Sequence, residues 1–368
     1  MKKLSLIIPL SFAVIGVSFT AYSFLDTFVI VKNAKKVTFS SKYDIPLGPI
    51  ATSSSRPTSS KSTSSSNNSS NSATLILTGP HTYYEDKTIE QIAALYTDTK
   101  VFREREHYSD PDIYIDITTH RDEADTTTYY VADIRIKNLG YFKTALANDT
   151  FGQNIKERTS DMCKRKKGIL AINGDTYGSQ EGGYVIRNGN LKEGEHRSTK
   201  NLSRKKPDDL VVKKDGTFEI IDERDVSFEE VVAMDPLDVF SFGPALINRN
   251  QITVTEKDEV GTALSGNRNQ RCAIGIVSPG HYYFVVSDGR NSDSNGISLF
   301  TLANIMKDLH CETAYNLDGG GSATMYLDDG TGNANKLGHL VNVPGQLQGD
   351  PSVKQREVSD IVYIGKEQ

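Results

Sequence analysis

The chain has 368 residues, which is enough for one large domain or two small ones. A formal net charge of −5 and a pI near 5.9 argue against a nucleic-acid partner bound through a broad basic surface. Only three cysteines are present, so a disulfide framework is excluded, and no Cys or His pair is spaced for a zinc site. The sequence also lacks a P-loop and a nucleophile elbow.

The N-terminal residues have the pattern of a membrane-directed segment. Lys2 and Lys3 precede an apolar run over residues 4–25, which is near the length that spans a bilayer and longer than the core of a typical signal peptide. We therefore expect residues 1–36 to be an uncleaved membrane anchor. A signal segment that is cleaved after secretion is the alternative.

A polar stretch follows the predicted anchor. Residues 52–72 are almost entirely Ser, Thr and Asn, a composition that cannot bury a core and is typical of a flexible tether. We expect a linker over residues 37–74 and a single folded domain over residues 75–368. Anchor, tether and domain together predict a single-pass protein of the cell membrane with its domain on the extracellular side.

Strand patterns outnumber helix patterns in the remainder of the chain. Apolar residues at helical spacing predict a helix over 88–96, with Thr88 as its N-cap, and another over 299–309 that begins after Ser298. Alternating or continuous apolar runs predict strands over 113–118, 129–136, 168–173, 211–221 (a hairpin turning at Asp215-Gly216), 238–247, 272–277, 282–287, 313–317 and 360–364. This order favours an α+β fold with a mixed, largely antiparallel sheet and flanking helices.

The strand predicted over residues 313–317 leads into an unusual loop. Asp318 comes first, followed by Gly319, Gly320, Gly321 and Ser322. Three successive glycines are conformationally costly, and their N–H groups can form a concave nest that binds an anion. A carboxylate beside such a nest suits a phosphate-bearing substrate. A tight turn that needs a positive φ is the alternative.

Two other buried strands end in the same way. Asn173-Gly174-Asp175 and Ser287-Asp288-Gly289-Arg290 repeat the combination of a polar side chain and a glycine that is seen at Asn316-Leu317-Asp318-Gly319. Each combination alone is compatible with a simple turn. Three carboxylates at strand ends, however, indicate a site that is held by a rigid scaffold.

Charged and amide side chains near these strand ends suggest two kinds of ligand. Arg271 and Arg290 could bind phosphate through paired hydrogen bonds, although surface ion pairs are the alternative. The loop after the third strand also offers the oxygen ligands of a calcium site without the spacing of an EF-hand, in Asp288, Asn291, Asp293 and Asn295. We expect no cofactor, and calcium is the alternative.

These motifs, taken in order, resemble those of the phosphodiester glycosidase family over about residues 129–364. The resemblance rests on Ile172-Asn173-Gly174-Asp175, Tyr184-Val185-Ile186-Arg187-Asn188-Gly189, Phe242-Gly243-Pro244, Arg271-Cys272-Ala273-Ile274-Gly275, Asp288-Gly289-Arg290, Ser298-Leu299 and Asn316-Leu317-Asp318-Gly319-Gly320-Gly321-Ser322. Cys272 stands where a threonine or similar small residue is expected. Residues before about Lys100 have no clear counterpart.

The resemblance implies hydrolysis of a sugar-1-phosphodiester, of the N-acetylglucosamine type, at the anomeric carbon of a surface glycan. The implied roles are phosphate binding by Arg271, Arg290, Gly319, Gly320, Gly321 and Ser322, base or nucleophile for Asp175 and Asp318 with Asp288 as the third candidate, and sugar binding by Asn173 and Asn316. Two alternatives remain open at this point. One is a non-catalytic module that binds a wall polymer, and the other is a phosphodiesterase that cleaves the P–O bond.

Overall fold

The structure is a computed structural model that describes residues 20, 23–26, 29–38, 46–47, 83–97, 101–104, 106–258, 268–332, 338–344 and 355–366. Most of the apolar run at the N-terminus and most of the predicted linker lie outside these residues. Within the described ranges, no helix is both long enough and apolar enough to cross a bilayer.

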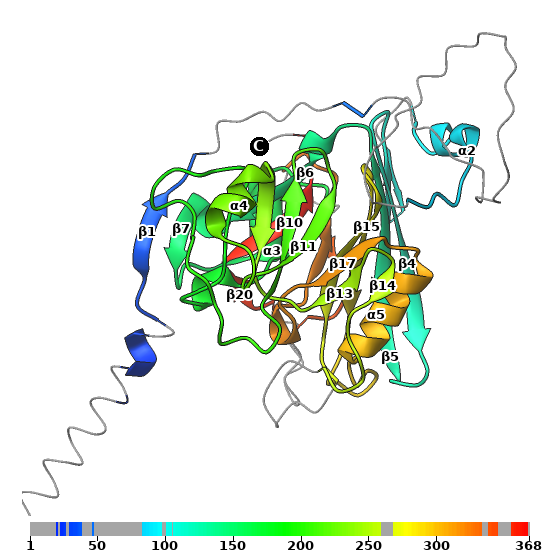
Figure 1. Cartoon of the computed structure of the whole chain (residues 1–368). Helices are drawn as coiled ribbons and strands as arrows, with labels where there is room; N and C mark the ends of the chain where they lie inside the picture. Colours follow the sequence, from blue (N-terminus) through cyan, green and yellow to red (C-terminus); the bar gives the residue numbers. More distant parts are fainter. Residues whose placement is uncertain are drawn as a thin grey trace, which may run out of the picture.

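The largest element is a nine-stranded sheet (Figure 1). Its strands are, in spatial order, β14 (Gln251–Ile252), β13 (Ala245–Asn248), β17 (Thr313–Asn316), β15 (Cys272–Ser278), β16 (His281–Ser287), β5 (Thr127–Ile136), β4 (Ile113–Asp122), β3 (His107–Ser109) and β2 (Val101–Glu104).

Smaller sheets pack against it. A five-stranded sheet has the order β19 (His339–Leu340), β18 (Met325–Leu327), β9 (Leu170–Asn173), β21 (Asp360–Ile364) and β6 (Phe142–Leu146), and a three-stranded sheet has the order β11 (Phe218–Asp222), β10 (Asp208–Lys213) and β12 (Pro236–Phe240). Two further pairs join β1 (Lys32–Lys36) to β7 (Thr150–Gln153) and β20 (Glu357–Val358) to β8 (Glu157–Arg158).

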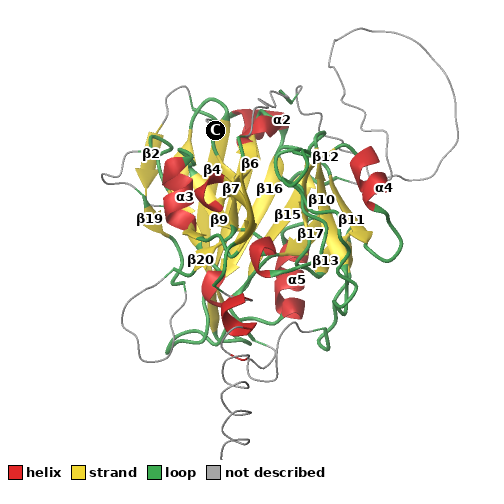
Figure 2. Ribbon diagram, turned by 90° about the vertical axis from the view of Figure 1, so that its left-hand side faces the viewer, coloured by secondary structure: helices red, strands yellow, loops and turns green. Residues whose placement is uncertain are grey.

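The main core lies between the sheets, and alternation along each strand builds it. In β15, for example, Ile274 points into the core that is shared with the two smaller sheets, whereas Ala273 points to the opposite face. That opposite face is covered by α5 (Leu299–Asp308). The fold is therefore layered, with sheets inside and helices outside (Figure 2).

The helices are short and cover outer faces. α3 (Thr159–Arg165) packs on the five-stranded sheet and α4 (Phe228–Ala233) on the three-stranded sheet. α2 (Ile89–Ala93) begins at Thr88 with a capping box, as its sequence predicts, and Ser298 caps α5. The described residues also include four single turns of 3-10 helix: η1 (Leu139–Tyr141), η2 (Ala147–Asp149), η3 (Tyr177–Ser179) and η4 (Gly320–Ser322).

The α+β class with a largely antiparallel sheet in one domain is confirmed. The expectation of a mixed sheet is not met, because all pairings between the described strands are antiparallel. The single strand expected over residues 238–247 is also wrong. β12 and β13 belong to different sheets, since the chain turns at Gly243, whose φ is +68°.

The segment Lys32–Lys36, assigned to the anchor by its sequence, belongs to the fold. It forms β1, which pairs with β7 through Lys32–Gln153 and Lys35–Phe151. Val37 follows and is 3% exposed, in a small apolar cluster with Phe151 and Tyr177. The described structure of the domain thus begins well before the boundary expected near Leu75.

Candidate active site

Two of the predicted motifs, from different sheets, meet at one edge of the molecule. β9 ends at Asn173, whose Nδ2 donates to the Asp318 carbonyl oxygen at 2.7 Å, and its Oδ1 accepts from the backbone N–H of Thr324 at 3.1 Å. The Asp318 N–H donates to the Gly174 carbonyl at 3.2 Å. Asn173 therefore fastens the two loops together. Its amide is fully buried and used within the protein, so the expected contact with sugar hydroxyls is not supported.

Asn316 joins a third motif to this edge. Its Nδ2 donates to the Gly243 carbonyl at 2.7 Å, and its backbone N–H donates to the Pro244 carbonyl at 3.2 Å. The side chain has no exposed surface, and its Oδ1 has no hydrogen-bond partner among the described residues. The position of Asn316 is thus structural as well, rather than open to a sugar.

Asp318 has the surroundings expected of an acid or base. The residue as a whole is half-buried, and its Oδ1 accepts from the Gly319 N–H at 2.9 Å. Burial raises the pKa of Asp318 to about 6, against the opposing effects of a hydrogen bond with Ser322 and the positive charge of Arg356. A carboxyl group with a pKa near 6 changes its protonation state close to neutral pH, as general acid–base catalysis requires.

Each of the three positions requires a glycine for a different steric reason. Gly320 has φ +59°, which favours glycine. A Cβ on Gly319 would lie 2.5 Å from the Gln270 carbonyl oxygen, and a Cβ on Gly321 would lie 2.9 Å from the Arg356 guanidinium. The N–H groups of Gly319 and Gly320 donate to Asp318 and Gln270, so they do not form the anion nest that the sequence suggested.

Two exposed guanidinium groups flank the glycines instead. Arg290 lies beside Gly320, and Arg356 lies against Gly321 and donates to the Ser322 hydroxyl at 3.5 Å. Arg271, in contrast, is 4% exposed and its Nε donates to the Ile297 carbonyl at 3.2 Å. Exposed guanidiniums beside a glycine loop are chemically suited to binding a phosphate.

Arg356 was not identified from the sequence. It lies outside every recognised motif, just before β20, and reaches the glycine loop through a contact that spans 34 residues of sequence. No local pattern marks such a residue, since a lone arginine is usually a solvated surface group. Only the backbone hydrogen bond from Arg356 to Gly321 at 3.3 Å and the packing described above bring it to the site.

Asp288 lies on the next strand end and is connected to the same loop. Its Oδ1 accepts from the Val343 N–H at 2.8 Å and its Oδ2 from the Tyr130 hydroxyl at 3.2 Å. Burial raises its pKa to about 6, which the hydrogen bonds from Val343, Tyr130 and Asn342 oppose. Asn342 also bonds to both Ala323 and Met325, directly after the glycine loop, so Asp288 and that loop share a support.

Asp175 occupies a different environment from the other two carboxylates. It has no exposed surface, and its oxygens accept from Arg187, the Tyr177 N–H and the Ser241 N–H at 2.7, 3.1 and 2.9 Å. Arg187 also bonds to Asp360 at 2.8 Å. The geometry does not support the role of base or nucleophile that the sequence suggested for Asp175, because its oxygens face the protein and not the surface.

Two of the suggested calcium ligands, Asp288 and Asn291, have hydrogen-bond partners within the protein. The Asn291 Oδ1 accepts from the N–H groups of Asp293 and Ser294, both at 2.8 Å, which closes a local turn. Within the described part of the chain, no cluster of three or more His, Cys, Asp or Glu is arranged to hold a metal ion.

Comparison with known proteins identifies the family of the chain. The sequence profile of the family described as phosphodiester glycosidase matches residues 166–365, which is more than half of the chain and includes all the strand ends above. The chain belongs to this family. The match establishes the family of the chain and leaves its substrate open.

Individual relatives are distant. The chain is 26% identical over 175 residues to the SPbeta prophage-derived uncharacterized protein YomE of Bacillus subtilis (strain 168), a match that covers 47% of the chain but only 26% of that protein. The catalytic domain of zebrafish N-acetylglucosamine-1-phosphodiester alpha-N-acetylglucosaminidase, auto-inhibited by its pro-peptide, aligns with a TM-score of 0.51 and 19% identity, over 81% of this chain and 100% of that one. A hypothetical protein from Synechocystis aligns at 14% identity with a TM-score of 0.49, over 69% and 62%. The zebrafish domain shares the fold of this chain.

Proposed function

We propose that this protein hydrolyses sugar-1-phosphodiesters, of the N-acetylglucosamine-1-phosphodiester type, at the anomeric C–O bond. The observation that carries the proposal is the position of Asp318 beside a glycine loop that two exposed guanidiniums flank. Membership of the phosphodiester glycosidase family supports the general reaction. The two guanidiniums beside the loop support a phosphate position there, with the reacting carbon near Asp318.

In this proposal the phosphate is held by Arg290 and Arg356 against Gly320 and Gly321. The bond between the anomeric carbon and the phosphate oxygen breaks, and its electron pair leaves with the phosphomonoester. Water adds to the anomeric carbon and gives its proton to Asp318. A phosphate leaving group is stable as an anion, so the cations that hold it contribute more than an acid would, whereas ordinary glycosidases need a carboxylic acid for this step.

Asp288 and Asp175 have supporting roles in the proposal. Asp288 holds Val343 and Tyr130 beside the loop and is the second carboxyl group with a pKa near 6. Asp175 fixes η3 and the turn at Ser241 through its buried hydrogen bonds. Asp318 is then the carboxylate that contacts the reacting atoms.

Hydrolysis in ¹⁸O-labelled water tests which bond breaks. In this test, the purified chain is incubated with the methyl phosphodiester of N-acetylglucosamine-1-phosphate, and both products are to be analysed by mass spectrometry. We expect the label in the sugar, because water attacks carbon. Label in the phosphate would instead establish attack at phosphorus, the P–O cleavage that many enzymes catalyse with paired metal ions.

The absence of turnover would favour the other alternative, a module that binds a wall polymer without cleaving it. An Asp318→Asn variant provides the control for contaminating activity. Any hydrolysis that remains unchanged in this variant does not come from the proposed site.

The proposed place of action is the cell surface, on phosphodiester-linked glycans. The apolar run over residues 4–25 and the polar stretch over residues 52–72 support this location. Fractionation of cells expressing the full chain, combined with protease treatment of intact cells, tests it. Recovery in the membrane fraction with a protease-accessible domain is expected, and recovery in the cytoplasm would contradict the proposal.

A further inference from the structure

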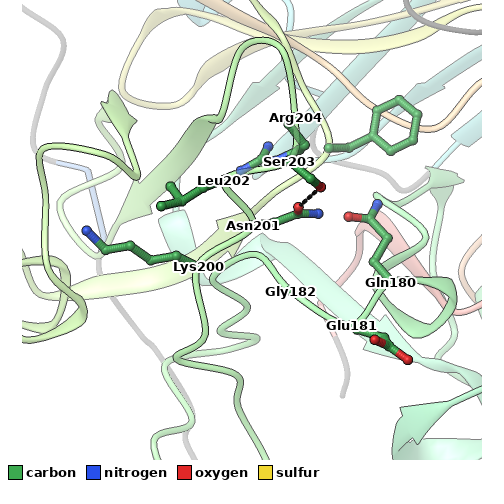
Figure 3. Close-up of a pocket in the computed structure, with 9 residues that line it drawn as sticks. Gln180, Glu181, Gly182, Lys200, Asn201, Leu202, Ser203 and Arg204 are labelled. Atoms are coloured by element: carbon green, nitrogen blue, oxygen red, sulfur yellow. Dashed lines mark hydrogen bonds between the residues drawn. The ribbon is translucent and has the colours of Figure 1, made fainter.

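A pocket of about 660 Å³ lies next to the strand ends that form the candidate site. This volume falls within the range of roughly 300–1,000 Å³ typical of small-molecule sites. It is lined by Gln180, Glu181, Gly182, Lys200, Asn201, Leu202, Ser203, Arg204 and Phe242. Figure 3 shows the two loops that form its walls, with Gln180 and Glu181 on one and Lys200–Arg204 on the other.

The pocket adjoins the site through two short covalent connections. Phe242 follows Ser241, whose N–H donates to Asp175, and precedes Gly243, whose carbonyl accepts from Asn316. Gln180 directly follows η3, whose first N–H also donates to Asp175. Phe242 and the wall that contains Gln180 are thus attached to groups that position the candidate site.

Strand order places the pocket on the side of Asp318 that is opposite to Arg290. At this edge β13 begins just after Phe242, β17 ends before Asp318, and β16 ends before Asp288 and Arg290. The order β13-β17-β15-β16 puts Asp318 between the pocket and Arg290. If the phosphate lies at Arg290, the sugar and whatever extends from it lie toward the pocket.

Buried ion pairs hold the walls in place. Arg204 pairs with Asp209 at 2.6 Å and with Glu223 at 2.9 Å, and Glu223 also accepts from the Asn201 N–H. The Arg197 guanidinium donates to the carbonyls of Gln180 and Gly183 at 2.7 and 2.8 Å. Both loops are therefore fixed before a ligand arrives, which reduces the cost of ordering them on binding.

The lining suits a neutral sugar better than a second phosphate. Arg204 is neutralised by its two carboxylate partners, and the remaining charges, on Lys200 and Glu181, are of opposite sign. Phe242 and Leu202 offer apolar surface for the C–H face of a pyranose ring, while Gln180 and Asn201 offer amides for its hydroxyls. Because the charges of the pocket lining nearly cancel, the pocket does not favour an anionic ligand.

We propose that this pocket binds neutral sugar residues that extend from the cleaved sugar on its non-reducing side, so that the preferred substrate is an oligosaccharide-1-phosphodiester. This inference rests on the proposed function for its orientation. It adds a substrate class: a glycan chain that is released from a phosphate at its reducing end, in place of a single sugar.

The test compares two substrates that differ only in the sugar. One is the methyl phosphodiester of N-acetylglucosamine-1-phosphate, and the other is the same compound carrying two more neutral sugars on its non-reducing side. We expect kcat/KM to be about tenfold higher for the longer substrate, since one well-filled pocket readily supplies that much binding.

Two pocket variants, Leu202→Ser and Gln180→Ala, are expected to reduce this preference about fivefold or more, mainly through KM, and to leave the short substrate within about twofold of wild type. Leu202 is 56% exposed, so its replacement does not threaten folding. Leu191→Ser is the matched control, because Leu191 is 40% exposed and does not line the pocket.

Failure of this inference is distinguishable from failure of the proposed function. Equal kcat/KM for both substrates would contradict the proposed sugar binding in the pocket, and so would a preference that Leu202→Ser and Gln180→Ala leave unchanged. Either result would leave the proposed hydrolysis reaction intact. If neither substrate is hydrolysed, binding of the phosphate-free trisaccharide, measured by calorimetry, decides. Binding that Leu202→Ser weakens and Leu191→Ser does not would support the pocket, and no binding would overturn it.

Discussion

Asp318 and Asp175 follow the ends of two buried strands that meet at one edge, yet their surroundings separate their roles. Both oxygens of Asp175 are used by Arg187 and by backbone N–H groups beneath the surface. Asp318 is partly exposed, and burial raises its pKa to about 6. A residue type at a strand end is therefore not enough to assign chemistry, because hydrogen-bond partners and exposure decide which carboxylate is available.

Replacing Asp318 with Asn removes the proposed base. We expect kcat to fall by about 10²- to 10⁴-fold, the usual contribution of a positioned general base. The measurement is steady-state hydrolysis of the N-acetylglucosamine methyl phosphodiester. Asp225→Asn, which removes the same charge at an exposed position, is the control. Full activity in Asp318→Asn would exclude the assignment.

The pKa of Asp318 predicts the acid limb of the pH profile. A base acts only when it is deprotonated, so kcat/KM should fall about tenfold per pH unit below a pH near 6 and level off above it. The residual activity of Asp318→Asn should lack this limb. A wild-type profile that is flat down to pH 4.5 would contradict the proposed base.

At the scale of elements, β9, β12 and β21 converge on one buried guanidinium. Arg187 donates to Asp175 and Asp360 and to the Val239 carbonyl, and Asp238 lies close enough to affect the pKa of Arg187. Burial raises the pKa of Asp360 to about 7, and Arg187 opposes that rise. A single cation thus stabilises several carboxylates that come from separate strands.

Arg187→Met should therefore destabilise the protein strongly. It leaves buried carboxylates without a counter-charge, which costs about 3–5 kcal/mol of unfolding free energy. The loss should be larger at pH 8 than at pH 5. A buried carboxyl with a raised pKa takes up a proton as pH falls, so the native state then binds more protons than the unfolded state and regains stability.

Urea unfolding at the two pH values measures this effect. Arg224→Met is the matched control, because Arg224 is exposed and pairs with Asp222 on the surface. The control should stay close to wild type. An Arg187→Met protein with an unchanged unfolding midpoint at pH 8 would show that the ion cluster does not support these strands.

Elements with strong periodicity could be predicted from the sequence, and irregular ones could not. β15 and β16 are buried on both faces and α5 has a clear apolar stripe, so their patterns are unambiguous. The Asp215-Gly216 turn also allowed the hairpin of β10 and β11 to be predicted. Strands of two or three residues, such as β18 and β20, hold too few residues for a period to be visible.

The same distinction applies to the site. Asp318 and its glycines are contiguous, so the sequence displays them together. Arg356 and Asn342 reach the loop only through the pairing of distant strands, and neither lies in a recognisable motif. The geometry does not support the sugar-binding roles predicted for Asn173 and Asn316, since an amide that binds a sugar and one that joins two loops look alike in sequence.

At the scale of the whole molecule, the N-terminal region combines two kinds of segment. Residues 4–25 have the composition of an anchor, whereas β1 and Val37 pack on the domain. Val37 shares a cluster with Phe151 and Tyr177, and the Tyr177 N–H donates to Asp175. The chain that leads away from the apolar run thus packs against η3, next to the candidate site.

Two shortened chains separate these contributions. Removal of residues 1–28 should leave stability and hydrolysis unchanged, because β1 and its pairing with β7 remain. Removal of residues 1–38 also deletes β1 and Val37, and should lower the free energy of unfolding by about 1–3 kcal/mol, the scale of one buried Val side chain. Urea unfolding of both chains at pH 7 measures the difference, and the first chain is the control for the second.

Because Val37 packs on the cluster that contains Tyr177, the second chain should also hydrolyse substrate more slowly. Equal unfolding midpoints and equal hydrolysis rates for the two chains would mean that β1 contributes neither to stability nor to activity, and that the functional domain starts after it.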